Sequence, residues 1–237
     1  SHDLRQPMHA VNVYLELFNP ENLPALEKKS LTKIKNSITA LNAMFDSLLN
    51  ISKLDADVMQ VSQRVFRLEE LASTIRDLVE TKAHNKDLTF HINAPDVLVQ
   101  GDKLLLQQII SNLASNAIQY TESGHIEINF DTFKDCLSIE VRDTGCGIHD
   151  VEQQQIFNQF FRSDRTRALH DGLGLGLSIV KRLCDLIGAE IQVFSQMGQG
   201  SQFVVKTPFE VSTHSEDTLP AKISSRSANA HQSLIGK

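Results

Sequence analysis

The stretch HDGLGLGLSIVK, residues 170–181, places Gly172, Gly174 and Gly176 at alternate positions before a segment with helical periodicity. Glycine allows positive φ angles and close approach of the backbone to a ligand. The N-terminus of a helix offers free amide N–H groups to anions. The stretch therefore predicts either a phosphate site or simply a tight loop into a helix. It is not a P-loop, because no Gly-Lys-Ser/Thr sequence closes it, and position 177, where a dinucleotide motif needs glycine, is leucine.

Two further segments carry side chains suited to a nucleotide. Asn112 and Asn116 are four residues apart, on one face of a predicted helix, and their amide oxygens could ligate a hard cation or contact phosphate. Asp143 ends a predicted strand just before Gly145 and Gly147, and a buried carboxylate there could accept a hydrogen bond from an amine such as that of adenine. Taken singly, these segments also fit a solvated polar stripe and an ordinary Asp-Gly turn.

The order and separation of these segments resemble the sensor histidine kinases, whose ATP-binding domain belongs to the GHKL superfamily. Four clusters match the N, G1, F and G2 boxes of that family: Asn112/Asn116, Asp143-x-Gly145-x-Gly147, Phe157-x-x-Phe160-Phe161-Arg162, and Gly172-x-Gly174-x-Gly176. The sequence GQGSQF, residues 198–203, resembles the last glycine element of the family. The resemblance extends from residue 1 to about residue 208 and implies a Bergerat-type α/β sandwich that binds ATP beneath a mobile lid.

The resemblance also implies a role for each matched residue. Asn116 would ligate a Mg²⁺ ion that bridges the phosphates, with Asn112 helping. Asp143 would bind the exocyclic amine of adenine, while Gly145 and Gly147 would let the backbone approach the base.

The remaining matched residues concern the nucleotide and the lid. Tyr120 would lie near the nucleotide, and the alternate glycines Gly172, Gly174 and Gly176 would hinge the lid and present amides to the phosphates. Arg162, Arg165 and Arg167 could neutralise phosphate charge, and the sequence does not choose among them. Phe157, Phe160 and Phe161 are expected to pack at the base of the lid.

The phosphate acceptor implied by the resemblance is His2. HDLRQP, residues 2–7, matches the H box of the family, in which an acidic residue follows the histidine and a proline stands five positions on. A neutral imidazole has a nucleophilic nitrogen, and Asp3 would orient it and act as general base. Pro7 lacks an N–H, so a kink is expected beside His2. Gln6 stands where Thr or Asn is most common, which leaves phosphatase activity open.

The first segment predicts a helical hairpin. Apolar residues recur with the spacing of a coiled-coil seam at Leu4, Met8, Val11, Leu15 and Phe18, and again at Ile34, Ile38, Leu41, Phe45 and Leu48. The prolines of NPENLP, residues 19–24, separate the two helices. One hairpin cannot bury both seams, so we expect a homodimer that forms a four-helix bundle.

The period changes after about residue 60, where helices and strands mix without a regular βαβ repeat. We expect strands around residues 61–68, 88–93 and 96–102, helices over EELASTIRDLVETKAHNKD and KLLLQQIISNLASNAIQY, with Asp102 as the N-cap of the second, and two later strand pairs. The predicted fold class is α+β: the helical hairpin followed by a sandwich with a mixed sheet. The expected domains are residues 1–58 for dimerisation and phosphotransfer, 59–212 for ATP binding, and 213–237 as a flexible tail.

Composition limits the partners and the cellular compartment that we expect. The 237 residues carry a net charge of −6 and no long basic run, so we expect no nucleic-acid partner. Three cysteines without a CxxC pair fit a reducing cytoplasm, and no apolar run is long enough to span a bilayer. The chain begins inside a patterned segment without methionine, so we read it as a fragment, whose parent could be membrane-anchored and could carry a receiver domain after the Ser-rich tail.

The function implied is that of an ATP-dependent protein-histidine kinase in two-component signalling, whose partner is a response-regulator receiver domain. Two alternatives remain. A GHKL ATPase usually carries Glu at the position of Asn112, and asparagine cannot serve as a general base. A nucleotide-binding signalling scaffold without turnover would carry the same residues in an inactive geometry.

Overall fold

The structure is a computed structural model that describes residues 61–133, 136–163 and 174–213, with short pieces at 13–14, 24, 27–35, 37–38 and 41. In chain order the elements are β1 (Arg64–Arg67), α3 (Leu68–His84), β2 (Thr89–Asn93), β3 (Val97–Gly101), α4 (Lys103–Tyr120), β4 (His125–Phe133), β5 (Cys136–Asp143), α6 (Gly176–Ile187), β6 (Glu190–Gln196) and β7 (Gly200–Thr213). Within these ranges, none of the helices has both the length and the apolar character needed to cross a membrane.

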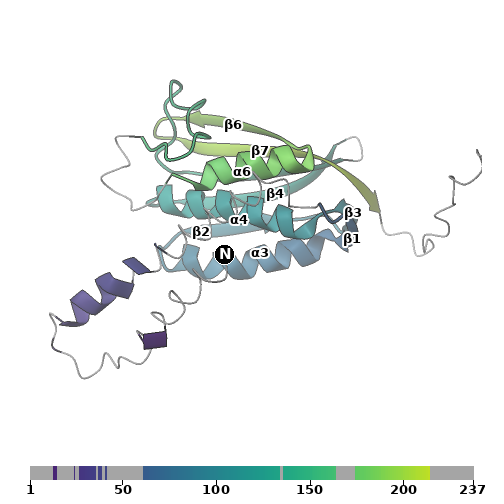
Figure 1. The fold of residues 1–237 in the computed structure, drawn as a ribbon. Coiled ribbons are helices and arrows are strands. Elements are labelled where there is room, and N and C mark those ends of the chain that lie inside the picture. Colours follow the sequence, from purple (N-terminus) through teal and green to yellow (C-terminus); the bar gives the residue numbers. More distant parts are fainter. Residues whose placement is uncertain are drawn as a thin grey trace, which may run out of the picture.

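A seven-stranded sheet carries α3, α4 and α6 on one face (Figure 1). The strand order is β1-β3-β7-β5-β4-β2, and β6 also pairs with β7. The pairing of β2 with β4 is parallel, whereas the other strand pairs of the described residues are antiparallel. The predicted α+β class with a mixed sheet is therefore confirmed.

The helix α4 lies between α3 and α6 and packs on β4 and β5. Its apolar face is formed by Leu106, Ile109, Leu113 and Ala117, and each of these residues is at 3% exposure or less. Because α4 is the central helix of its layer, the position of α4 determines where its polar side chains lie relative to the neighbouring elements.

The strands β2 and β3 form as predicted, but they do not pair with each other. The connection through Ala94 and Pro95 leads from β2, which pairs with β4, to β3, which pairs with β1 and β7. Short strands with a proline turn between them look like a hairpin in sequence, and only long-range pairing distinguishes the two arrangements.

The last strand, β7, does not end at Pro208 but continues through it to Thr213. Pairing of β7 with β5 shifts register between Cys136 and Ser138, opposite the segment Thr207–Phe209. The Thr207 hydroxyl donates to the Leu137 carbonyl (3.0 Å) and accepts from the Phe209 N–H (3.2 Å). The bulge accommodates a proline that has no N–H to give to the ladder, so β7 reaches β3 beyond it.

Both ends of α4 are held by side chains from other parts of the chain. Asp102 is the N-cap as predicted: its Oδ1 accepts from the N–H groups of Leu104 and Leu105, each at 3.1 Å, and its Oδ2 accepts from the Ser62 N–H at 2.8 Å. At the other end, Lys86 Nζ donates to the carbonyls of Ile118 (2.7 Å), Gln119 (3.0 Å) and Thr121 (2.9 Å). An ammonium group at a helix C-terminus satisfies carbonyls that lack a partner in the helix.

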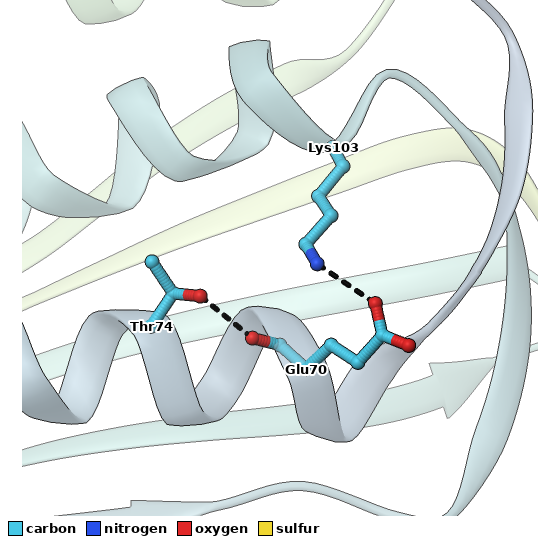
Figure 2. A network of polar contacts seen from close by, with 3 residues as sticks. All are labelled: Glu70, Thr74 and Lys103. Carbon is cyan, nitrogen blue, oxygen red and sulfur yellow. Dashed lines mark hydrogen bonds and ion pairs between the residues drawn. The ribbon is translucent and has the colours of Figure 1, made fainter.

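A second contact links α3 to the start of α4. Figure 2 shows Lys103 Nζ pointing to Glu70 Oε2 at 2.9 Å, while the Thr74 hydroxyl donates to the Glu70 carbonyl at 2.8 Å. The hydrogen bond from Lys103 and its charge lower the pKa of the Glu70 carboxyl. Because the carboxylate is exposed, this pair adds little stability, and burial of α3 against the sheet keeps the two helices together.

Little of the predicted helical hairpin lies within the described residues. Residues 13–14, 27–35, 37–38 and 41 are helical, and the Lys28 N–H donates to the Pro24 carbonyl at 3.0 Å. The remainder of the hairpin and the tail from residue 214 lie outside the described residues.

Replacement of the α4 cap should lower stability. In Asp102→Ala, three N–H groups lose their acceptor, and we expect the free energy of unfolding to fall by about 1–2 kcal/mol. Asp102→Asn retains one oxygen for the cap and should lose less. Urea denaturation of the three proteins tests the order, and equal midpoints would show that the carboxylate contributes nothing.

Candidate functional site

A cavity of about 540 Å³ opens between α4, the loop that follows β5, and the first residues of β7. Six of the residues predicted to bind a nucleotide line it: Asn116, Tyr120, Asp143, Gly145, Gly147 and Arg162. Residues that come from separate parts of the sequence thus share one cavity, of a size that suits a small-molecule ligand.

Asp143 lies on the wall of this cavity because of the strand alternation of β5. Leu137, Ile139 and Val141 point to the core, and Asp143 is the next residue on the same face, at 6% exposure. Its Oδ1 accepts from the N–H groups of Gly145 (2.8 Å) and Ser201 (3.3 Å). Both bonds are made to Oδ1. No group of the described residues donates to Oδ2, so this oxygen is available to a ligand.

Burial raises the pKa of the Asp143 carboxyl, and the two N–H groups partly oppose the increase. A carboxylate with one oxygen held and one oxygen facing a cavity is a directed acceptor for an amine. Its desolvation costs the folded chain free energy unless a ligand supplies the missing donor.

The loop after Asp143 requires glycine at two positions. A Cβ on Gly145 would collide with the Tyr120 carbonyl oxygen and stand 2.8 Å from Asp143 Oδ1. Gly147 has φ of +71°, and a Cβ there would collide with the Gln196 carbonyl oxygen. The loop therefore passes closely between the end of α4 and the β6–β7 turn, with its backbone forming part of the cavity wall.

Asn112 and Asn116 converge on the start of α6. A Cβ built on Gly176 would lie 3.5 Å from Asn116 Oδ1 and 3.6 Å from Asn112 Oδ1, and Asn112 Nδ2 donates to the Gln108 carbonyl (2.8 Å). The N-cap residue of α6, Leu175, makes no side-chain capping bond. Two amide oxygens and an uncapped helix N-terminus thus meet at one point, which suits a cation and an anion bound together.

The segment before α6 is held against two of the three phenylalanines of the sequence pattern, Phe160 and Phe161. The Phe160 N–H donates to the Gly174 carbonyl at 2.9 Å, and Gly174, with φ of +71°, lies against the Phe161 carbonyl. Phe157 and Phe161 pack against the hydrophobic core. Phe160 is 55% exposed and has φ of +62°. The expectation that the three phenylalanines pack at the base of the lid stays a prediction, because residues 164–173 lie outside the described residues.

Several predicted residues are not tested by this geometry. His2, Asp3, Arg165, Arg167 and Gly172 lie outside the described residues. Asn112, Gly174 and Gly176 lie beside the cavity without lining it. The structure therefore brings the predicted base-binding and amide groups together and leaves the phosphoacceptor unplaced.

Sequence reasoning assigned no role to several residues that line the cavity, among them Ser201 and Cys146. Ser201, whose N–H binds Asp143, lies within the GQGSQF element and alternates with the buried Phe203 and Val205, a signal that could have assigned it to the site. Cys146 has a free thiol at the cavity, and burial, followed by the charge of Asp143, raises the pKa of that thiol. Nothing in the sequence distinguished Cys146 from any other loop residue.

Comparison with known families gives two matches. Residues 101–211 match the family described as histidine kinase-, DNA gyrase B- and HSP90-like ATPase, and residues 1–57 match the His Kinase A (phospho-acceptor) domain. The chain belongs to the sensor histidine kinases. Its ATPase domain, with the cavity described above, is the ATP-binding GHKL domain of this family.

Similar proteins include the sensor histidine kinase RcsC of Escherichia coli (strain K12), 35% identical over 88% of this chain and 22% of RcsC. The signal transduction histidine-protein kinase BarA of the same strain is 33% identical over 86% of this chain and 23% of BarA. Full-length ShkA, solved in complex with AMPPNP, superposes with a TM-score of 0.74 at 27% identity, covering 90% of this chain and 45% of ShkA. This histidine kinase chain thus spans less than a quarter of the two curated relatives.

The variant Asp143→Asn should lose nucleotide affinity without losing its fold. Asparagine keeps an oxygen for the N–H groups of Gly145 and Ser201 but places an NH₂ donor where Oδ2 stands. We expect ATP to bind about 10- to 100-fold more weakly, as measured by titration calorimetry, because one charged hydrogen bond is lost. Unchanged affinity would remove Asp143 from the binding site.

The same variant should be at least as stable as the native chain without nucleotide. Because the folded pKa of Asp143 is raised, its contribution to stability is present below the unfolded pKa and is lost as pH rises through the folded pKa. Asparagine carries no charge, so the melting temperature of the variant relative to the native chain should be higher at pH 8 than at pH 4. A relative decrease at pH 8 would contradict the raised pKa.

Gly176→Ala should separate stability from binding. The added methyl makes ordinary contacts with both asparagines, and alanine favours a helix by up to about 1 kcal/mol over glycine. The methyl nevertheless occupies the space between the amide oxygens and the helix N-terminus, so ATP affinity should fall while the melting temperature is unchanged or higher. Lys181→Ala, which breaks only an exposed pair with Asp185 on α6, is the control; equal affinity in both variants would contradict the assignment.

Proposed function

We propose that this chain acts as an ATP-dependent protein-histidine kinase that phosphorylates His2 and passes the phosphoryl group to an aspartate of a response-regulator receiver domain. The proposal combines the two family matches with the geometry of the cavity. The observation that carries it is the convergence of Asn112 and Asn116 on the uncapped start of α6, close to a cavity walled by the buried Asp143.

The arrangement supports a bound nucleotide with its base at Asp143 and its phosphates at α6. Asp143 Oδ2 would accept from the exocyclic amine of adenine, with the backbone of Gly145 and Gly147 against the ring. The phosphates would meet the amides of α6, and Arg162, on the cavity wall, would reduce their charge. The AMPPNP bound to full-length ShkA supports this choice of ligand class.

Magnesium fits the same point. Oxygen ligands, few from protein and the rest from phosphates and water, are what Mg²⁺ prefers, and the amide oxygen of Asn116 would supply one, with Asn112 beside it. When bound, the ion would draw charge from the phosphates during transfer. The residues of this chain hold that oxygen ligand in place and present the helix amides.

The nitrogen of His2 would attack the terminal phosphorus, with its other ring nitrogen oriented by Asp3. Bond formation to nitrogen accompanies cleavage of the bond from phosphorus to the bridging oxygen, and ADP leaves. The receiver aspartate then takes the phosphoryl group in a second transfer. Both transfers are substitutions at phosphorus, so neither needs an oxidant or a further co-substrate.

We propose a homodimer for the first segment. Ile34 and Leu41, two members of the predicted seam, are 49% and 45% exposed in the single chain, and exposed seams of this spacing pack in helical bundles.

We retain residues 1–58, 59–212 and 213–237 as the proposed division into dimerisation domain, ATP-binding domain and tail. ATP and receiver domains point to the cytoplasm as the place of action.

Phosphotransfer is tested with γ-labelled ATP and Mg²⁺. We expect acid-labile, alkali-stable label on the native chain, and none on His2→Gln or Asn116→Ala, because the first variant lacks the nucleophile and the second lacks the metal ligand. His9→Gln is the matched control and should keep its label.

Three other outcomes would overturn the proposal. Label that persists in His2→Gln would place the acceptor elsewhere. Free phosphate released without protein label would identify an ATPase, and nucleotide binding without either product would identify a signalling scaffold.

A further inference from the structure

The hydroxyl of Ser195, near the end of β6, is a junction of three segments around the cavity. Its Oγ accepts from the Ile148 N–H at 2.8 Å and donates to the Gly200 carbonyl at 2.8 Å. It also lies 3.0 Å from the Ser201 hydroxyl, its register partner on β7. The side chain is half-buried, and the cavity itself is lined by Ile148 and Ser201 but not by Ser195.

The hydrogen-bonding capacity of this hydroxyl is fully used. A serine hydroxyl has one proton and two lone pairs. The proton goes to the Gly200 carbonyl, so the two lone pairs take the Ile148 N–H and the Ser201 hydroxyl. Removal of this one oxygen leaves two donors and one carbonyl without their partner.

The partners of Ser195 lead directly to the predicted base site. The Ser201 N–H binds Asp143 Oδ1 at 3.3 Å, and Ile148 follows Gly147 in the loop that approaches the base. Gln153 reinforces the same joint, because its Nε2 donates to the carbonyls of Ser195 (3.0 Å) and Ile148 (3.3 Å). A carboxylate and a loop that both line the cavity therefore share one anchor.

We propose that Ser195 is a positioning residue for nucleotide binding, which sets the distance between Asp143 and the loop at Ile148 without touching the ligand. This inference rests on the proposed function of the cavity as the nucleotide site. It assigns Ser195 to the base end of that site, through its links to Asp143 and Ile148, and not to the phosphate end at the asparagines and the start of α6. Removal of the Ser195 hydroxyl should lower the affinity for every ligand that carries adenine by the same factor.

The test compares ATP with adenosine on the full chain. In Ser195→Ala we expect both to bind about tenfold more weakly, a difference of about 1.4 kcal/mol, with KM for ATP raised equally and kcat for phosphorylation unchanged. Ser195→Thr retains the hydroxyl and should restore both affinities. Ser212→Ala, an exposed serine on β7, is the matched control and should behave as the native chain.

Each other result overturns the assignment. Native affinity in Ser195→Ala, whatever its melting temperature, would make the hydroxyl purely structural. A larger loss for ATP than for adenosine would move its effect to the phosphate end, and failure of threonine to restore binding would show that the hydroxyl is not the cause. If the native chain binds neither ligand, the proposed function itself fails, which the native titration reveals before any variant is compared.

Discussion

Asp143 stands on the core-facing side of β5, where the alternation of the strand would otherwise place an apolar residue. A carboxylate at 6% exposure needs donors, and two backbone N–H groups supply them from opposite directions: Gly145 two residues on, and Ser201 on the neighbouring strand. The sharp loop after β5, with its glycines, brings the Gly145 N–H to this carboxylate. The register between β5 and β7 brings the Ser201 N–H to it. The cavity is the space that remains beside it.

The second requirement is that α4 be held along its length. Asp102 fixes its first turn, Lys86 fixes its last carbonyls, and the apolar face between them is buried. On a rigid rod with 1.5 Å rise per residue, the asparagine pair then has a defined place against α6. Precision at the site comes from anchors at the ends of the helix, far from the ligand.

Sequence patterns predicted the features that depend on interactions between residues close together in the chain. Asp102 was recognisable as a cap because its side chain serves the next few residues, and α4 and β5 were recognisable from their periods. Contacts between distant residues have no comparable local signal in the sequence. Three features could not be predicted for this reason: the separation of β2 from β3, the bonds of Lys86 to the end of α4, and the hydroxyl junction at Ser195. The nucleotide residues were found through their order along the chain, and that order could not show that Phe160 points to solvent.

The position of β7 in the sheet has a consequence for synthesis of the chain. It is the last strand of the sheet in sequence, yet it lies between β3 and β5 and supplies the one pairing that joins them. Before it leaves the ribosome, the strands can form only two separate pieces, β1 with β3 and β5 with β4 and β2. Since Ser201 follows Asp143 by 58 residues, a nascent chain that has already formed α3, α4 and α6 still lacks the second N–H donor to the Asp143 carboxylate. Competence for ATP therefore arrives only after β7 has emerged from the ribosome, in the step that closes the sheet.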